Sequence, residues 1–214
     1  MNLDNYKYII WDWNGTLLND VDYCVGCMNQ LLEERHMPLL TKEKYQDVFT
    51  FPVQDYYQKL GFDFQKESFS IVGHAFMDLY FKNLHTCQLH TNAIGILTFF
   101  QEKGLQQFIL SAMEHISLVE LLNEMKIAHY FNGVYGIDNH LAAGKSDRAK
   151  TMISEYDIDV NKALLLGDTL HDYEVAQELG CNALLIANGH QNEGRLQTYG
   201  GLVLSDLKQL IDKD

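Results

Sequence analysis

The feature that most constrains the fold is a regular alternation of helical patterns and short apolar runs after residue 92. Helices are predicted over residues 92–103, 115–126, 146–156 and 171–179, with a final helix from Asp206. Strands are predicted over residues 108–110, 133–136, 163–166, 183–187 and, more weakly, 202–204. Such alternation is typical of a parallel sheet that is covered by helices on both faces.

One further strand is predicted before this region, followed by a long helical stretch. Residues 8–11 form a short apolar run that stops at an acid, as a buried strand does. We expect Asn19 to be the N-cap of a helix that ends near Glu34. Shorter helical patterns follow at residues 42–49, 53–60 and 68–84. The expected fold is therefore a doubly wound, Rossmann-like α/β core, residues 1–18 and 86–214, with a small helical cap domain inserted at residues 19–85.

Composition and charge exclude several classes of partner. The 214 residues are 47% hydrophobic and 21% charged, as in globular proteins. The net charge of −13 argues against binding to nucleic acid or to an anionic membrane. The sequence shows no signal peptide and no long apolar run, so we expect a cytoplasmic protein. It indicates no oligomeric state. The spacing of Cys24 and Cys27 is better explained by the place of Cys24 on the apolar stripe of a helix than by a redox pair or half a zinc site.

Acidic residues follow two of the predicted strands. Asp12 comes directly after the first strand, and Asp168 and Asp172 come after the strand at residues 163–166. The carboxyl ends of parallel strands form the usual ligand site of such sheets, so these side chains are expected to meet. Three carboxylates repel one another unless a cation lies between them, and hard oxygen ligands suit Mg²⁺.

Four motifs in this order carry a resemblance to a known family. They are DWNGTLLND from Asp12, Ser111 at a predicted strand end, Gly144-Lys145 before a helix, and GDTLHD up to Asp172. Together they resemble the haloacid dehalogenase-like hydrolase superfamily, and within it the phosphoglycolate phosphatase-like enzymes. The resemblance implies a phosphatase with a helical cap that acts on a small phosphorylated metabolite.

The resemblance also implies roles for individual residues. Asp12 is the expected nucleophile, which forms an aspartyl-phosphate. Asp12, the backbone carbonyl of Asn14, Asp168 and Asp172 are the expected Mg²⁺ ligands. Lys145 is expected to neutralise the charge of Asp12 and of the phosphate. This assignment agrees with the chemistry, because a carboxylate that attacks a phosphate dianion needs positive charge nearby.

The same resemblance assigns the residues around the substrate. Ser111 and the backbone N–H of Ala112 are expected to hold the phosphoryl oxygens, and Thr16 is expected to orient the first loop at the substrate. The cap is expected to select the substrate. Residues 50–57, which mix aromatic and amide side chains, form a candidate specificity loop. Alternatively, the aromatic residues of this segment belong to the hydrophobic core of the cap.

One position departs from the family pattern. Phosphatases of this family usually carry a second Asp two residues after the nucleophile, as general acid and base, and here that residue is Asn14. An amide transfers no proton near neutral pH, and such transfer contributes about 10²–10⁴ in rate. Three interpretations remain open: a phosphatase that uses water, His115 or His171 instead, a phospho-ligand binding or regulatory protein with little turnover, or deamidation at Asn14-Gly15.

Overall fold

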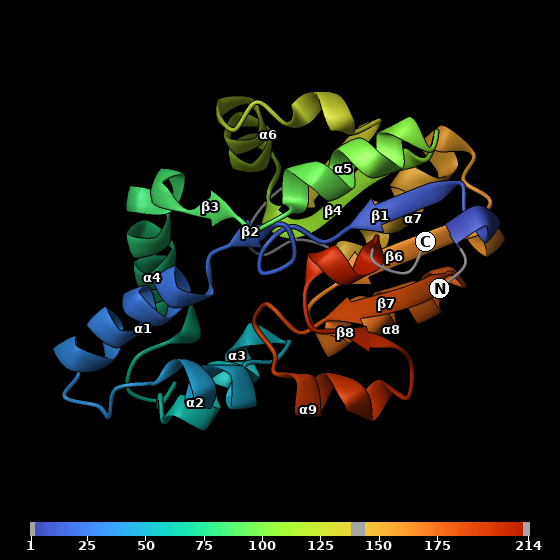
Figure 1. Ribbon diagram of the computed structural model, residues 1–214. Helices are drawn as coiled ribbons and strands as arrows, with labels where there is room; N and C mark the ends of the chain where they lie inside the picture. Colours follow the sequence, from blue (N-terminus) through green and yellow to red (C-terminus); the bar gives the residue numbers. More distant parts are fainter. Residues whose placement is uncertain (1–2, 138–143, 212–214) are drawn as a thin grey trace.

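The core of the protein is a six-stranded parallel sheet. The computed structural model describes residues 3–137 and 144–211. The strand order is β5-β4-β1-β6-β7-β8 (Figure 1). The strands are β1 (Tyr8–Trp11), β4 (Gln106–Glu114), β5 (Gly133–Ile137), β6 (Ala163–Gly167), β7 (Asn182–Ile186) and β8 (Val203–Leu204). Because β1 lies between β4 and β6, the residue that follows it, Asp12, reaches the middle of the carboxyl edge.

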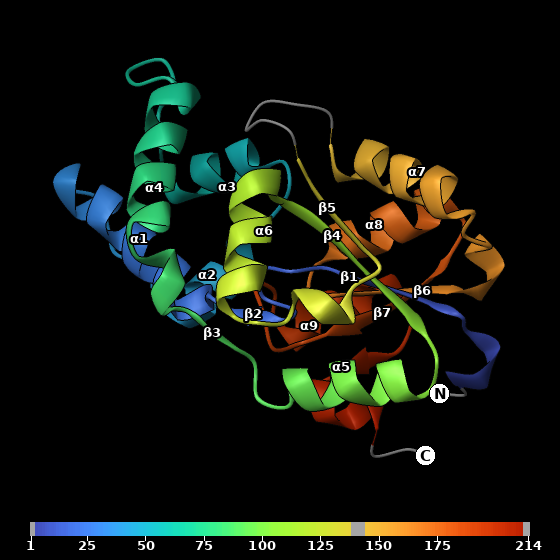
Figure 2. The ribbon, with the colours of Figure 1, turned by 90° about the horizontal axis from the view of Figure 1, so that it is seen from above.

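Helices cover both faces of this sheet, as Figure 2 shows. Successive side chains of a strand point to opposite faces. Ile9 and Trp11 of β1 belong to the apolar cluster that includes α5 and α6, and Ile10 belongs to the cluster that includes α7 and α8. These helices are α5 (Ala93–Glu102), α6 (His115–Glu124), α7 (Lys145–Tyr156) and α8 (Leu170–Leu179). The predicted doubly wound α/β fold is confirmed.

Four helices lie to one side of the sheet, at its carboxyl edge (Figure 1). They are α1 (Val21–Glu34), α2 (Lys42–Val48), α3 (Val53–Leu60) and α4 (Phe69–Asn83). The chain enters and leaves this region through a small antiparallel ribbon, in which β2 (Leu18–Asn19) pairs with β3 (Gln88–Leu89). The helical region is consistent with a cap. Cys24 and Cys27 are buried, free thiols on α1, in agreement with the apolar stripe.

Three local predictions are wrong. Asn19 is not an N-cap but belongs to β2, and Asp20 precedes α1 without capping it. Ser111 lies inside β4, not at its end, because the strand continues through an irregular register between Leu110 and Glu114. In the described part of the chain, the helix expected from Asp206 is only a short 3-10 helix.

The remaining elements are short. They are one α-helix, α9 (Glu193–Leu196), and the 3-10 helices η1 (Leu3–Asn5), η2 (Leu84–Thr86), η3 (Ala128–Tyr130), η4 (Val160–Lys162), η5 (Gln197–Tyr199) and η6 (Leu207–Leu210). Within residues 3–137 and 144–211, no helix combines the length and apolarity needed to cross a membrane.

Candidate active site

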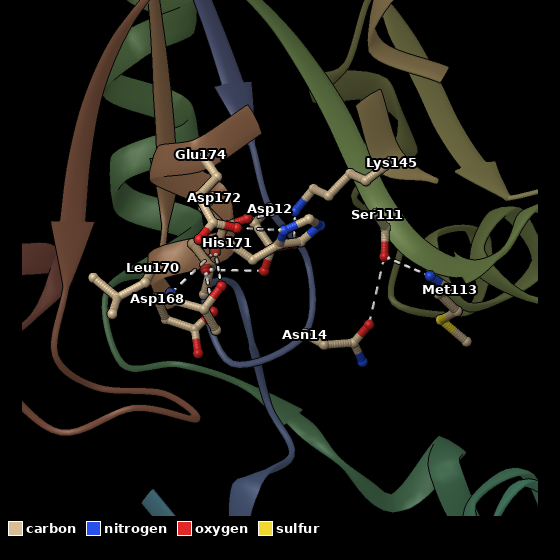
Figure 3. Close-up of polar contacts among 12 residues, drawn as sticks. Asp12, Asn14, Ser111, Met113, Lys145, Asp168, Leu170, His171, Asp172 and Glu174 are labelled. Atoms are coloured by element: carbon tan, nitrogen blue, oxygen red, sulfur yellow. Dashed lines mark hydrogen bonds and ion pairs between the residues drawn. The ribbon is translucent and has the colours of Figure 1, made fainter. Parts of the chain in front are cut away.

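Three carboxylates converge at the carboxyl edge of the sheet (Figure 3). Asp12 follows β1, Asp168 follows β6, and Asp172 lies in the first turn of α8. One oxygen of each lies within 4.8 Å of the others, and all three residues are buried. The structure therefore brings together the three side chains that the sequence analysis selected as metal ligands.

Lys145 supplies positive charge to this cluster. It is the first residue of α7, and its Nζ donates to Asp12 and, at 2.5 Å, to Asp172 (Figure 3). Burial alone would lower the pKa of Lys145, but the two carboxylates raise it above its usual range. Burial likewise opposes ionisation of Asp172, yet Lys145 holds the pKa of that carboxyl below its usual value. This pair is therefore charged at neutral pH.

One lysine does not compensate three buried acids. Burial, together with the neighbouring acids Asp172 and Asp168, raises the pKa of Asp12 to about 8 in spite of Lys145. Burial also raises the pKa of Asp168 to about 6. A divalent cation would remove this penalty, and a set of carboxylate oxygens is what Mg²⁺ prefers. The residues present therefore fit the Mg²⁺ that the sequence analysis expected; the carbonyl ligand from Asn14 stays a prediction.

Hydroxyl groups orient the carboxylates. Asp172 accepts hydrogen bonds from the backbone N–H and the hydroxyl of Thr169, at 3.0 and 2.7 Å, in a capping box at the start of α8. The hydroxyl of Thr16 lies 2.9 Å from Asp168 and 3.1 Å from Asp12. Thr16 is fully buried, so the structure gives it a contact that positions two acids; its predicted role at the substrate stays a prediction.

Two glycines allow the loops to approach the acids closely. Gly15 has a φ of +78°, and a Cβ there would lie 2.3 Å from Asp168. A Cβ on Gly189, in the loop after β7, would lie 2.0 Å from the same carboxylate. Real Cβ contacts are never so short. Both positions therefore need glycine for Asp168 to keep its place.

The side-chain amide of Asn14 forms hydrogen bonds with two residues of the helical region. Its Nδ2 donates to Asp20 at 2.9 Å and to the Tyr80 hydroxyl at 2.7 Å, and Tyr80 donates to Asp20 at 2.7 Å. The Asn14 oxygen lies 3.5 Å from the hydroxyl of Ser111, which it faces in Figure 3. Ser111 in turn accepts from the backbone N–H of Met113 at 3.0 Å.

This geometry suits an amide and opposes an acid at position 14. The amide nitrogen of Asn14 is a donor between two oxygen acceptors, one of them the Asp20 carboxylate. A second carboxylate in the same place would face the first one. The residues around position 14 therefore suit the Asn14 found here better than the Asp that the family usually carries.

Sequence reasoning missed a second buried cluster beside the first. Asp20 accepts from the backbone N–H of Gly15 at 2.9 Å and lies 3.4 Å from Nε2 of His190. The backbone N–H of His190 donates to Asp168 at 2.5 Å. The Nδ1 atom of the His190 ring lies 2.8 Å from the Tyr45 hydroxyl. Burial opposes a charge on His190, but the neighbouring acids, chiefly Asp20, raise its pKa to about 9.

The sequence contains a signal for one member of this cluster. His190 follows the end of β7, where the rule that located Asp12 and Asp168 also applies. Asp20 had none, because its place before a helix is explained equally well by the helix dipole. Its partners Tyr80 and His190 are distant in sequence.

A cavity of about 350 Å³ lies between the acid cluster and the helical region. Ala112 lines it, as do Phe51, Tyr56 and Tyr57 from the candidate specificity loop. His171 also lines it, with its ring against Phe51 and its Nδ1 3.2 Å from Glu174. The other histidine considered, His115, is not among the described lining residues.

Comparisons with known proteins agree with this architecture. The family model of haloacid dehalogenase-like hydrolases matches residues 9–186. A phosphoglycolate phosphatase from Pseudomonas savastanoi pv. phaseolicola is 21% identical, over 96% of this chain and 78% of that protein. A haloacid dehalogenase-like hydrolase structure from Streptococcus pneumoniae has a TM-score of 0.83 at 19% identity, with 98% of each chain covered. A predicted phosphoglycolate phosphatase from Haemophilus somnus has a TM-score of 0.79 at 16% identity, with 97% of each chain covered. With most of its length matched by the family model, the chain belongs to the haloacid dehalogenase-like hydrolase family.

Proposed function

We propose that this protein is a Mg²⁺-dependent phosphatase that hydrolyses a small organic phosphate ester through an aspartyl-phosphate, with residues 19–85 as its cap. The observation that carries the proposal is the buried Asp12 carboxylate, paired with Lys145 and set beside Asp168 and Asp172. The proposed nucleophile, the lysine beside it and the proposed metal ligands all line one cavity, which supports this assignment. The phosphoglycolate phosphatase from Pseudomonas savastanoi supports the phosphatase class.

The chemistry divides into two displacements at phosphorus. An oxygen of Asp12 forms a bond to phosphorus as the bond to the alcohol oxygen breaks, and the departing alkoxide takes up a proton from water. A water molecule then attacks the same phosphorus atom and gives up a proton to solvent, while the bond to Asp12 breaks and phosphate leaves. Mg²⁺ held by Asp12, Asp168, Asp172 and the Asn14 carbonyl would neutralise the phosphoryl oxygens.

The chain's own residues have separate tasks in this scheme. Lys145 favours the anionic form of Asp12, which a bound cation would favour further, and it offsets the charge of the incoming phosphate. The Ser111 hydroxyl and the N–H of Ala112 hold the phosphoryl oxygens. Thr16 fixes the orientation of the nucleophile through its contact with Asp12.

A second candidate is a protein that binds a phosphorylated ligand with little turnover. The observation that favours it is Asn14, which carries no proton for the leaving alcohol. In that case the cation, Lys145 and Ser111 would still hold a phosphoryl group. Esters with good leaving groups would lose least from the missing acid.

A panel of phosphate esters with and without Mg²⁺ separates the two candidates. The phosphatase proposal predicts phosphate release from p-nitrophenyl phosphate and small esters, which EDTA and Asp12→Asn abolish. Binding of beryllofluoride without turnover of any ester would support the second candidate. Turnover that survives Asp12→Asn would overturn the proposed nucleophile.

A further inference from the structure

The wall of the cavity that faces the acid cluster is strongly apolar. The helical region and the end of β4 contribute Phe49, Phe51, Phe69, Phe76, Met77 and Met113. The cavity also includes Tyr56, whose hydroxyl is buried and has no hydrogen-bond partner in the described part of the chain. A phosphate held at Asp12 would therefore place its alcohol half among aromatic rings.

The described part of this wall offers no unpaired lysine or arginine to a second negative charge on the substrate. Among the described lining residues, Lys145 is the only Lys or Arg, and it is paired with Asp12 and Asp172. His190 is enclosed by Asp20 and Asp168. A carboxylate on the alcohol half would be desolvated against apolar side chains, without a lysine or arginine partner among the described lining residues.

The arginine of the helical region lies outside this wall. Arg35 donates to both carboxylate oxygens of Glu67, at 2.7 and 2.8 Å, and is not a described lining residue of the cavity. The imidazole of His74, which does line it, has its Nδ1 2.6 Å from the backbone oxygen of Ser70, one turn earlier in α4. His171, the remaining imidazole among the described lining residues, has its ring against Phe51 and its Nδ1 3.2 Å from Glu174. Among the described lining residues, no lysine or arginine is therefore left for a glycolate-like carboxylate.

We propose that the substrate is a phosphate monoester of an uncharged, apolar alcohol that carries an aromatic or similarly flat ring, and not of a hydroxy acid. The inference rests on the proposed function for the position of the phosphate. The volume of about 350 Å³ lies within the roughly 300–1,000 Å³ of ordinary ligand pockets. A ring-sized group fills such a space, whereas a two-carbon acid leaves most of the apolar wall uncovered.

A substitution at Gly73 of α4 can test the role of this wall. It lines the cavity, and a Cβ there would meet only Phe69, at 4.0 Å. A leucine at this position would occupy part of the cavity. Gly26 of α1 is a matched control, because it is also inside a helix, is exposed, and has nothing within 4 Å of its Cβ position. Leucine favours the helix over glycine at both sites, so both variants are expected to fold.

Binding of two non-hydrolysable phosphonates tests the inference without turnover. Calorimetry in Mg²⁺ compares 1-naphthylmethylphosphonate with 3-phosphonopropionate, which carries a carboxylate. We expect the naphthyl compound to bind at least 10-fold more tightly, because a single methylene in an apolar pocket already contributes about 10–200-fold. Gly73→Leu should reduce its affinity by about the same factor, and Gly26→Leu by less than about 2-fold. Equal or tighter binding of the carboxylate compound, or no effect of Gly73→Leu, overturns the inference.

Turnover tests the proposed function separately. Release of phosphate from methyl phosphate, 1-naphthyl phosphate and 2-phosphoglycolate is measured with the native protein and with Gly73→Leu. We expect 1-naphthyl phosphate to be preferred, and its kcat/KM relative to methyl phosphate to fall about 10–200-fold in Gly73→Leu. No turnover of any ester would overturn the proposed function while the phosphonate binding still decides the substrate class. A preference for 2-phosphoglycolate would overturn the inference while supporting the phosphatase.

Discussion

Replacing Asn14 by the aspartate that its family usually carries should destabilise this protein. The amide nitrogen of Asn14 donates to the Asp20 carboxylate at 2.9 Å and to the Tyr80 hydroxyl at 2.7 Å. In Asn14→Asp both of these hydrogen bonds are lost, and a second carboxyl group lies next to Asp20. The family residue is therefore expected to be a poor fit in this particular chain.

The size of the effect follows from these contacts. A hydrogen bond to a charged acceptor contributes about 1.5–3 kcal/mol. Two carboxylates about 4 Å apart repel each other by about 4 kcal/mol at an effective dielectric constant of 20. The new carboxyl group can escape this repulsion by keeping its proton, which costs about 1.4 kcal/mol for each pH unit above its ordinary pKa. We therefore expect Asn14→Asp to lower the free energy of unfolding by about 2–4 kcal/mol at pH 7.

The pH dependence has a definite sign. A carboxyl group whose pKa is raised by folding keeps its proton in the folded state after the unfolded state has lost it. The free energy of unfolding then falls as pH rises above the unfolded pKa. The penalty of Asn14→Asp should be small near pH 4 and should grow toward pH 7.

Urea unfolding of a double-mutant cycle tests this reasoning. In the background of Asp20→Asn the new carboxylate faces an amide, so Asn14→Asp should cost less than about 1 kcal/mol there. Asp20→Asn alone also removes a partner of His190, which is why the cost is compared within each background. An equal cost of Asn14→Asp in both backgrounds would refute the proposed conflict with Asp20.

Two further predictions concern the metal. In Gly189→Ala the new Cβ would collide with Asp168, so the affinity for Mg²⁺ should fall by about 10–100-fold. Gly194→Ala is the control, because its Cβ would lie 3.4 Å from Asn192, and it should change the affinity little. Equal Mg²⁺ affinities of the two variants by calorimetry would contradict this prediction. Because burial raises the pKa of Asp12 to about 8 and of Asp168 to about 6, the metal-free protein holds protons that its unfolded state has lost, and Mg²⁺ must displace them. Mg²⁺ affinity should therefore rise with pH between about 6 and 8, with proton release detected by calorimetry in buffers of different ionisation enthalpy; a constant affinity would count against these acids as ligands.

The sheet and the main acid cluster were predictable because both depend on local patterns. Apolar runs separated by helical segments specify parallel strands, and the edge of such a sheet is known before any side chain is placed. Asp12, Asp168 and Asp172 follow from that rule, and Lys145 from the motif at the start of a helix. The structure brings all four together.

The second cluster was not predictable in the same way. Asp20 meets Tyr80 and His190 only when the helical region has packed against the core, and no local pattern encodes that contact. The pairing of β2 with β3 is similar, since two-residue strands leave no periodicity. Ser111 was misplaced because polar and small residues interrupt the apolar run of β4, although the strand continues.

The central claim, that Asp12 carries the phosphoryl group, has one direct test. The protein is mixed with p-nitrophenyl phosphate and Mg²⁺, quenched in acid during turnover, and treated with borohydride, which reduces an aspartyl-phosphate to homoserine. Peptide mass spectrometry should then find homoserine at position 12 only when ester and Mg²⁺ are both present, and not in Asp12→Asn. Turnover of the ester with an unmodified residue 12 would contradict the account.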